Sequence, residues 1–142
     1  MSFTSIQRIR FDDVDGAGIV YYPRFFHLCH AAFEDFFNAE GPYSYPELIG
    51  KRRMGFPTVH LESDFRFPLK YGDSARVTLA VEKVGHKSAT FRYTIHRDEG
   101  GELSFECRIV TALMDLNTGK SVAIEGELRS LLLRHQAESS HS

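Results

Sequence analysis

The 142-residue sequence has no tryptophan, only two cysteines and almost no excess charge of either sign. Cys29 and Cys107 are too few for a disulfide framework or a zinc site with four thiolate ligands. Lys+Arg 17 against Asp+Glu 19 gives a formal net charge of -2, so no overall positive field would attract nucleic acid or an anionic membrane. We therefore expect neither nucleic acid nor a membrane as a partner.

Long apolar runs are also missing. No stretch approaches the roughly 20 apolar residues that span a bilayer, and residues 1–8 lack the apolar core of a signal peptide. Together with the low cysteine content, this predicts a cytoplasmic protein. What is present is ordinary for a globular protein, since 42% hydrophobic and 25% charged residues exclude disorder, collagen and coiled coil. The length predicts a single domain over residues 1–142.

The residue pattern changes from strand to helix near the N-terminus. Residues 5–11 indicate a short strand, followed by an acidic, glycine-containing loop over residues 12–18. Apolar side chains then recur at helical spacing over residues 22–39, with Pro23 in the first turn and Gly41-Pro42 as a stop signal. This predicts one long helix with a wide apolar face.

The rest of the chain is typical of strands. After a predicted loop over residues 43–55, apolar and polar side chains alternate in four segments separated by good turn sequences, and a short helix closes the chain. The predicted strands are residues 58–68, 75–84, 87–97 and 103–116, and the closing helix is 124–135. We expect an α+β fold in which a single antiparallel sheet, with these four strands in a meander, wraps around the one long central helix.

Three acids precede the start of the predicted helix. Asp12, Asp13 and Asp15 lie within four positions, and a helix N-terminus presents unpaired N–H groups and partial positive charge. One interpretation is that the acids only cap the helix and complement its dipole. The other is that a carboxylate there attacks, or activates water against, a carbonyl that the helix start polarises. Three acids with no histidine nearby would suit only a hard metal ion.

Residues 11–25, FDDVDGAGIVYYPRF, resemble the signature of the hot-dog fold acyl-CoA thioesterases, in particular the 4-hydroxybenzoyl-CoA thioesterase branch. Residues 55–59, GFPTV, and 65–73, FRFPLKYGD, are similar to that family's second strand and following turn. The resemblance implies a hot-dog fold and hydrolysis of an acyl-CoA substrate to free acid and CoA. It implies no metal and no other cofactor, and a homodimer or homotetramer with sites at the dimer interface.

The resemblance also implies roles for individual residues. Asp15 matches the catalytic carboxylate, and Tyr22 stands where a backbone N–H at the helix start points at the thioester carbonyl. Substrate-binding positions by the same comparison are Gly18, Phe26, His30, Phe56, Thr58 and His60. CoA-binding positions are His86, Lys87 and Ser88. His30 replaces an acid that recognises the ring hydroxyl in the 4-hydroxybenzoyl enzymes, which puts that specificity, but not the reaction, in question.

Other groups have plainer interpretations. A second branch of the superfamily uses a helix glutamate, but with Asp15 in the motif we interpret Glu34 as a solvated or interface residue. His27 and His30 lack a third zinc ligand, and both cysteines are interpreted as inert core residues. The basic segment 51–53 is either a solvated loop or a CoA phosphate contact. Two other functions stay open: a non-catalytic acyl-CoA binding protein, and a hot-dog hydroxyacyl dehydratase, which would need a His–acid pair that no matching motif supplies.

Overall fold

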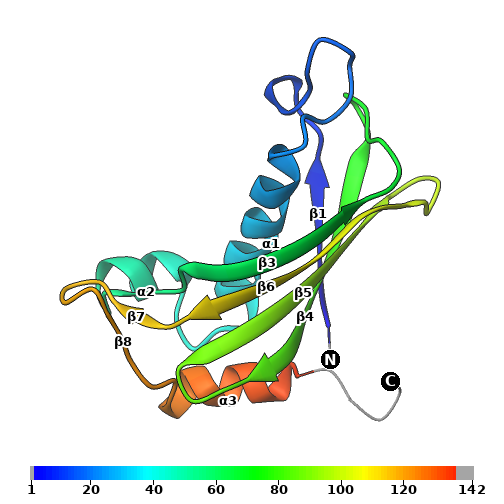
Figure 1. Ribbon diagram of the computed structural model, residues 1–142. Helices are drawn as coiled ribbons and strands as arrows, with labels where there is room; N and C mark the ends of the chain where they lie inside the picture. The colour runs from blue at the N-terminus through cyan, green and yellow to red at the C-terminus, as the bar shows by residue number, and fades with distance from the viewer. Residues whose placement is uncertain (1, 137–142) are drawn as a thin grey trace.

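The long central helix, α1 (Arg24–Glu40), lies against one face of a curved antiparallel sheet (Figure 1). The computed structural model describes residues 2–136. The sheet consists of β1 (Phe3–Arg8), β4 (Ser74–Val84), β5 (Ser88–Arg97), β6 (Leu103–Ala112) and β3 (Thr58–Phe65), in that spatial order. A strand, a long helix and a run of strands therefore give the α+β architecture that the sequence predicts.

The apolar pattern of α1 explains its position. Seven of its side chains are buried, and Phe33, Phe36 and Phe37 contact one another edge to face at the centre of the core. Pro23 stands just before the first helical residue, and the helix ends at Gly41, whose N–H donates to the carbonyl of Phe37 at 3.0 Å. The predicted boundaries, residues 22–39, differ by two residues at the start and one at the end.

The predicted meander is wrong in one respect. β4, β5 and β6 do follow one another as neighbours, but β3 pairs with β6 and lies at the edge opposite β1. Alternating apolar residues indicate a strand but say nothing about its partner, so the sequence pattern could not reveal this crossover. As a result β3 keeps one unpaired edge among the described strands.

The structure also contains a second, three-stranded sheet, whereas the sequence predicted a single sheet. The predicted strand 103–116 breaks at Leu113, and the chain continues as β7 (Met114–Asp115), which pairs with β2 (Met54–Gly55) and β8 (Lys120–Ser121). Leu113 donates its N–H to the carbonyl of Lys87 at 2.9 Å, which redirects the chain away from β3. The three short strands form a second, small sheet beyond the end of the main one.

Three short helices complete the fold. A single 3-10 turn, Phe11–Asp13, and α2 (Tyr45–Gly50) occupy segments that the sequence indicated as loops. α2 begins at Ser44, whose hydroxyl accepts a hydrogen bond from the N–H of Glu47 at 3.3 Å. α3 (Gly126–Arg134), which the sequence did predict, packs near β4 and places the buried ring of His135 4.9 Å from that of Phe36.

Candidate active site

The loop that carries Asp15 connects the 3-10 turn to α1. Asp15 is exposed, and its Oδ1 accepts a hydrogen bond from the N–H of Ala17 at 2.9 Å. Its backbone closes the loop, because its N–H donates to Ile19 and its carbonyl accepts from Gly18, both at 2.9 Å. Gly18 has a φ of 82°, a conformation that glycine adopts without strain. No cation within residues 2–136 forms an ion pair with Asp15.

The start of α1 leaves an N–H group unused. Within the part of the chain that the structure describes, no atom accepts a hydrogen bond from the N–H of Tyr22, whereas the N–H of Tyr21 donates to the carbonyl of Asp13 at 2.9 Å. Pro23 has no N–H, so Tyr22 carries the last donor before the helix begins. Its ring is largely exposed and packs against Phe65 at 6.1 Å between centroids. Tyr22 therefore offers a donor where the positive end of the helix dipole lies.

A buried ion pair fixes the loop to the helix. Asp13 is only 4% exposed, and its Oδ1 accepts from Nε and one Nη of Arg24 at 3.0 and 2.9 Å. Its Oδ2 accepts from the backbone N–H of Arg10 at 2.8 Å. The neighbouring Asp12 is exposed and lies 3.6 Å from Arg24. Of the three acids, Asp13 thus has a structural role that sequence spacing alone did not separate from that of Asp15.

A mostly apolar cavity lies between α1 and the sheet. It has a volume of about 230 Å³. It brings together four of the predicted substrate-binding residues, Phe26 and His30 from α1 and Phe56 and Thr58 from the start of β3 and the link before it. The other lining residues, which sequence reasoning missed, are Cys29, Phe33, Leu61, Tyr93, Ile109 and Thr111. Alternation in the sequence places Tyr93 on the apolar face of β5, but it does not indicate that a cavity lies beneath that face.

Two of the polar side chains that line this cavity are those of His30 and Tyr93. His30 Nδ1 lies 2.9 Å from Glu34 Oε2, one turn along α1. Both side chains are partly exposed, and no matching motif in the sequence indicated this His–acid contact. Burial raises the pKa of the Tyr93 phenol well above its usual value, so Tyr93 is neutral at ordinary pH. A neutral phenol and an oriented imidazole suit hydrogen bonding to a polar group on an otherwise apolar ligand.

The remaining predicted residues lie elsewhere in one copy of the chain. His60 is exposed on β3, 3.5 Å from Glu62, while Leu61 points into the cavity, because successive side chains alternate across a strand. His86, Lys87 and Ser88 form the β4–β5 turn beside α3, at the opposite end of the sheet from the Asp15 loop (Figure 1). The structure thus does not bring the predicted CoA turn close to Asp15 within one copy.

The basic segment 51–53 is partly engaged within the chain. Arg52 stacks over the ring of Tyr43 at 4.1 Å and lies 3.5 Å from Glu47. Arg53 donates to Asn117 and to the carbonyl of Ile49. Two of the three cations are therefore occupied by protein groups, which favours the solvated-loop interpretation over a phosphate contact.

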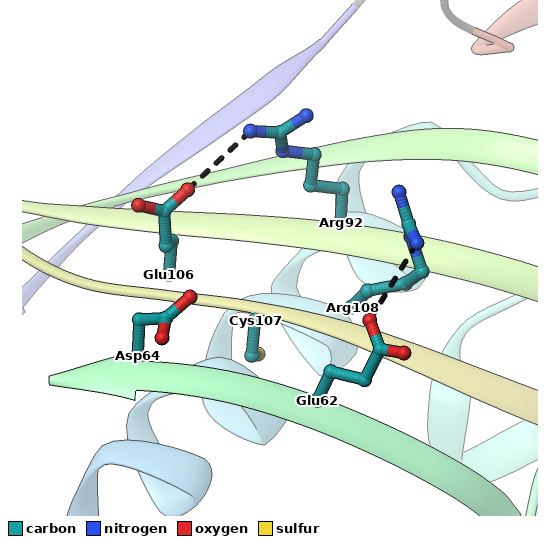
Figure 2. Close-up of a pocket in the computed structure, with 6 residues that line it drawn as sticks. All are labelled: Glu62, Asp64, Arg92, Glu106, Cys107 and Arg108. Carbon is teal, nitrogen blue, oxygen red and sulfur yellow. Dashed lines mark hydrogen bonds and ion pairs between the residues drawn. The ribbon is translucent and has the colours of Figure 1, made fainter.

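A second groove lies on the outer face of the sheet over β3, β5 and β6 (Figure 2). It is lined by charged side chains that pair with one another: Arg92 with Glu106 at 3.4 Å and Arg108 with Glu62 at 3.6 Å. Because these charges already satisfy each other at an exposed surface, the groove offers little to an acyl group. Within residues 2–136, no three His, Cys, Asp or Glu side chains cluster as metal ligands would, and no helix is long and apolar enough to cross a membrane.

Comparison with known proteins now identifies the family. Residues 9–132, which include the Asp15 loop, α1 and the whole main sheet except β1, match the thioesterase-like superfamily. The chain belongs to this superfamily. The solved structures below share its architecture, so the sheet around one helix is a hot-dog fold, as the sequence predicted.

Individual relatives are similar over most of the chain. A 1,4-dihydroxy-2-naphthoyl-CoA hydrolase of Nostoc punctiforme is 32% identical over 95 residues, which are 67% of this chain and 64% of that protein. One from Synechocystis is 30% identical over 102 residues, 72% and 73% of the two chains. The crystal structure of a Synechocystis 1,4-dihydroxy-2-naphthoyl-CoA thioesterase superimposes with a TM-score of 0.83 at 25% identity, and the match covers 94% of this chain and 96% of that one. The structure of a 4-hydroxybenzoyl-CoA thioesterase bound to 4-hydroxybenzoyl-CoA superimposes with a TM-score of 0.82 at 25% identity, and the match covers 92% of this chain and 98% of that one.

The structure of the loop predicts different outcomes for its two adjacent acids. Asp13→Asn should lower the free energy of unfolding by about 2 kcal/mol, because the amide cannot satisfy both Arg24 and the Arg10 N–H as the carboxylate does. Asp12→Asn, the matched control at an exposed position, should change it by less than about 0.5 kcal/mol. Urea denaturation measures both values. Equal losses in the two variants would contradict the proposed role of Asp13.

Proposed function

We propose that this protein hydrolyses an acyl- or aryl-CoA thioester to a free carboxylic acid and CoA. The observation that carries the proposal is the N–H of Tyr22, which has no acceptor among the described residues and directly precedes α1. The loop of Asp15 leads into the same helix, and side chains farther along that helix line the apolar cavity. Membership of the thioesterase-like superfamily supports the reaction class, and relatives named as CoA-thioester hydrolases support the substrate class.

The mechanism follows from the charges at the helix start. The thioester carbonyl accepts a hydrogen bond from the Tyr22 N–H, which together with the helix dipole stabilises negative charge as it develops on the oxygen. Asp15 then either attacks the carbonyl carbon to form a mixed anhydride or removes a proton from an attacking water. In both routes the C–S bond breaks, CoA leaves as its thiol after protonation, and water supplies the oxygen of the acid.

The cavity favours an aromatic acyl group. Phe26, Phe33 and Phe56 supply flat apolar walls, and a planar ring packs against such walls edge to face or offset. If Glu34 accepts a hydrogen bond from His30 Nδ1–H, the ring's Nε2 is an acceptor for a hydroxyl on the acyl group. The names of the Nostoc and Synechocystis relatives, which act on a dihydroxynaphthoyl thioester, agree with a hydroxylated aromatic substrate.

A complete site needs a second copy of the chain. β3 is an unpaired edge in which seven of eight residues are exposed, including the large apolar side chains Val59, Leu61 and Phe65. Such an edge pairs readily with the same edge of another copy, forming a two-fold homodimer that can pair further into a homotetramer. Pairing would add Phe56, Thr58 and His60 of one copy to the surroundings of the other copy's helix. It would also allow the Lys87 turn of one copy to meet CoA bound at the other.

The buried thiols support a location in the cytoplasm. Cys29 and Cys107 lie in contact as free cysteines, which is the usual state in a reducing compartment. No resident metal or other cofactor takes part in the proposed reaction.

One observation favours a second candidate, the hydroxyacyl dehydratase. The His30–Glu34 pair could remove a proton beside a thioester carbonyl and so promote loss of water. The two reactions differ in product: hydrolysis releases a free CoA thiol, and dehydration leaves the thioester intact with a new double bond. Thiol release from a panel of aryl, short-chain and long-chain acyl-CoAs, with absorbance of the enoyl product followed in parallel, separates them.

The first functional prediction concerns Asp15. Asp15→Asn should lower turnover at least about 10²-fold, because the amide can neither attack the carbonyl nor accept a proton. The exposed position leaves thermal stability nearly unchanged. Asp12→Asn serves as the control and should retain activity. A protein that only binds acyl-CoA would show no turnover to lose and unchanged binding in both variants, and near-normal hydrolysis by Asp15→Asn would remove Asp15 from the mechanism.

The second concerns the exposed Lys87 of the β4–β5 turn. Lys87→Ala should raise KM for an acyl-CoA severalfold and leave the hydrolysis of a truncated thioester without the nucleotide unchanged, because only the nucleotide carries phosphates for a lysine to bind. Lys120→Ala, another exposed lysine on a different hairpin, is the control. Equal effects of Lys87→Ala on both substrates would show that Lys87 does not hold the nucleotide.

The third concerns His30. His30 is exposed in one copy of the chain, where a bound acyl group would cover it. A carboxylate covered in this way would penalise a ligand without a hydroxyl more strongly than an imidazole does, because the carboxylate loses more when it is left unpaired. We therefore expect kcat/KM for 4-hydroxybenzoyl-CoA and benzoyl-CoA within roughly tenfold, about 1.4 kcal/mol. His30→Asp should shift the ratio toward the hydroxylated substrate. A preference of the unmodified protein of about a thousandfold would mean that another residue recognises the hydroxyl.

A further inference from the structure

The only two cysteines of the chain meet in the core. Cys29 on α1 and Cys107 on β6 are 78 residues apart in sequence, yet their Sγ atoms lie 4.0 Å apart. Their exposed fractions are 1% and 5%. Two small apolar residues could fill this space equally well, so burial alone assigns them no function. Their direct contact, and the position of one of them at the cavity wall, go beyond simple packing.

We propose that Cys29 and Cys107 form an oxidation site, at which hydrogen peroxide converts the two thiols into a reversible disulfide that joins α1 to β6. The access route is the cavity beside α1, since Cys29 is one of its lining residues. Cys107 is also one of the residues that line the outer groove, but its Sγ lies 4.0 Å from that of Cys29 on the helix side of the sheet. In the proposal the cavity is the entrance, so that the oxidant meets Cys29 first.

The chemistry balances with one peroxide molecule. The sulfur of Cys29 attacks one peroxide oxygen, the O–O bond breaks, and a sulfenic acid and one water form. The sulfur of Cys107 then attacks the sulfenic sulfur, the S–O bond breaks, and the hydroxyl leaves as a second water with the thiol proton. The protein loses two hydrogens and two electrons, which the peroxide accepts. A thiol reductant reverses the change.

Two features of the pair determine how the reaction proceeds. Burial, and secondarily the neighbouring Cys107 thiol, raises the pKa of Cys29 well above its usual value, so little thiolate is present and oxidation is slow. The apolar cavity admits a small uncharged peroxide more readily than a large charged disulfide such as oxidised glutathione. We therefore expect a reaction that needs excess peroxide and that a ligand filling the cavity slows.

Disulfide formation changes the cavity. The sulfurs must approach from 4.0 Å to about 2.05 Å, so α1 and β6 move together at the wall that Cys29 and Tyr93 share. If the cavity receives the acyl group, as the proposed function requires, this movement disturbs substrate placement. Since a displacement of about 1 Å can cost 10²-fold in rate, kcat/KM should fall by about tenfold or more.

Intact mass after peroxide treatment tests the oxidation site without reference to activity. The purified full chain is exposed to excess hydrogen peroxide, quenched with catalase, unfolded and alkylated. We expect a single chain that has lost two hydrogens and takes up no alkyl group, with dithiothreitol restoring two alkylated cysteines. Cys29→Ala and Cys107→Ala are matched controls, because neither can lose two hydrogens within one chain. Two alkylated cysteines in the treated protein, added oxygen without hydrogen loss, or a link between two chains would overturn the proposal.

A second measurement addresses the cavity and depends on the proposed function. The ratio of kcat/KM after and before oxidation should fall in the unmodified protein, recover with dithiothreitol and stay near one in Cys29→Ala, which has no thiol at the cavity wall to oxidise. A disulfide that forms without lowering this ratio would overturn the effect on the cavity. Absence of any hydrolysis before oxidation would instead contradict the proposed function, while the mass result would still decide whether the disulfide forms.

Discussion

Burial of one apolar helix is the constraint on which the other features depend. α1 carries phenylalanines on more than one side, and Phe36 and Phe37 have no exposed surface, so a flat sheet could not cover them. The main sheet curves around the helix instead (Figure 1). The sheet also covers the first turn, where Phe25 is buried against Phe105 of β6. Tyr22 lies before the first residue of α1, and its N–H stays without a partner among the described residues.

The proposed chemistry requires that the acidic loop keep a fixed position relative to the start of this helix. Asp13 provides it, since its carboxylate binds Arg24 of the helix and the N–H of Arg10 before the loop. The nearby Asp15 stays exposed and free of ion pairs within residues 2–136, and so remains available to a substrate. Asp13 thus holds the loop in position, whereas Asp15, two residues on, is the acid to which we assign the chemistry in the proposed function. In the proposed homodimer, the unpaired β3 edge would bring a second copy of the chain to the surroundings of the helix.

Local patterns predicted much of this fold. Helical spacing of apolar residues identified α1 to within two residues, and alternation located the strands of the main sheet, because both patterns depend on neighbours a few positions apart. The loop motif implied the thioesterase-like superfamily, which residues 9–132 do match, while the roles of Asp15 and Tyr22 stay predictions. The short helix α2 and the break at Leu113 were missed, since a capped turn and a change of pairing partner leave little periodic signal.

The sequence by itself determined the long helix, the main strands, the α+β class and the family, since these depend on local periodicity and on one contiguous motif. Only the tertiary structure decided which residues that are distant in sequence come into contact. Pairing of β3 with β6 turned Leu61 rather than His60 toward the cavity, because strand register selects the face of every side chain. Packing of α1 on β6 brought together two thiols 78 residues apart. Such contacts are set by how the elements pack, and no spacing within the chain encodes them.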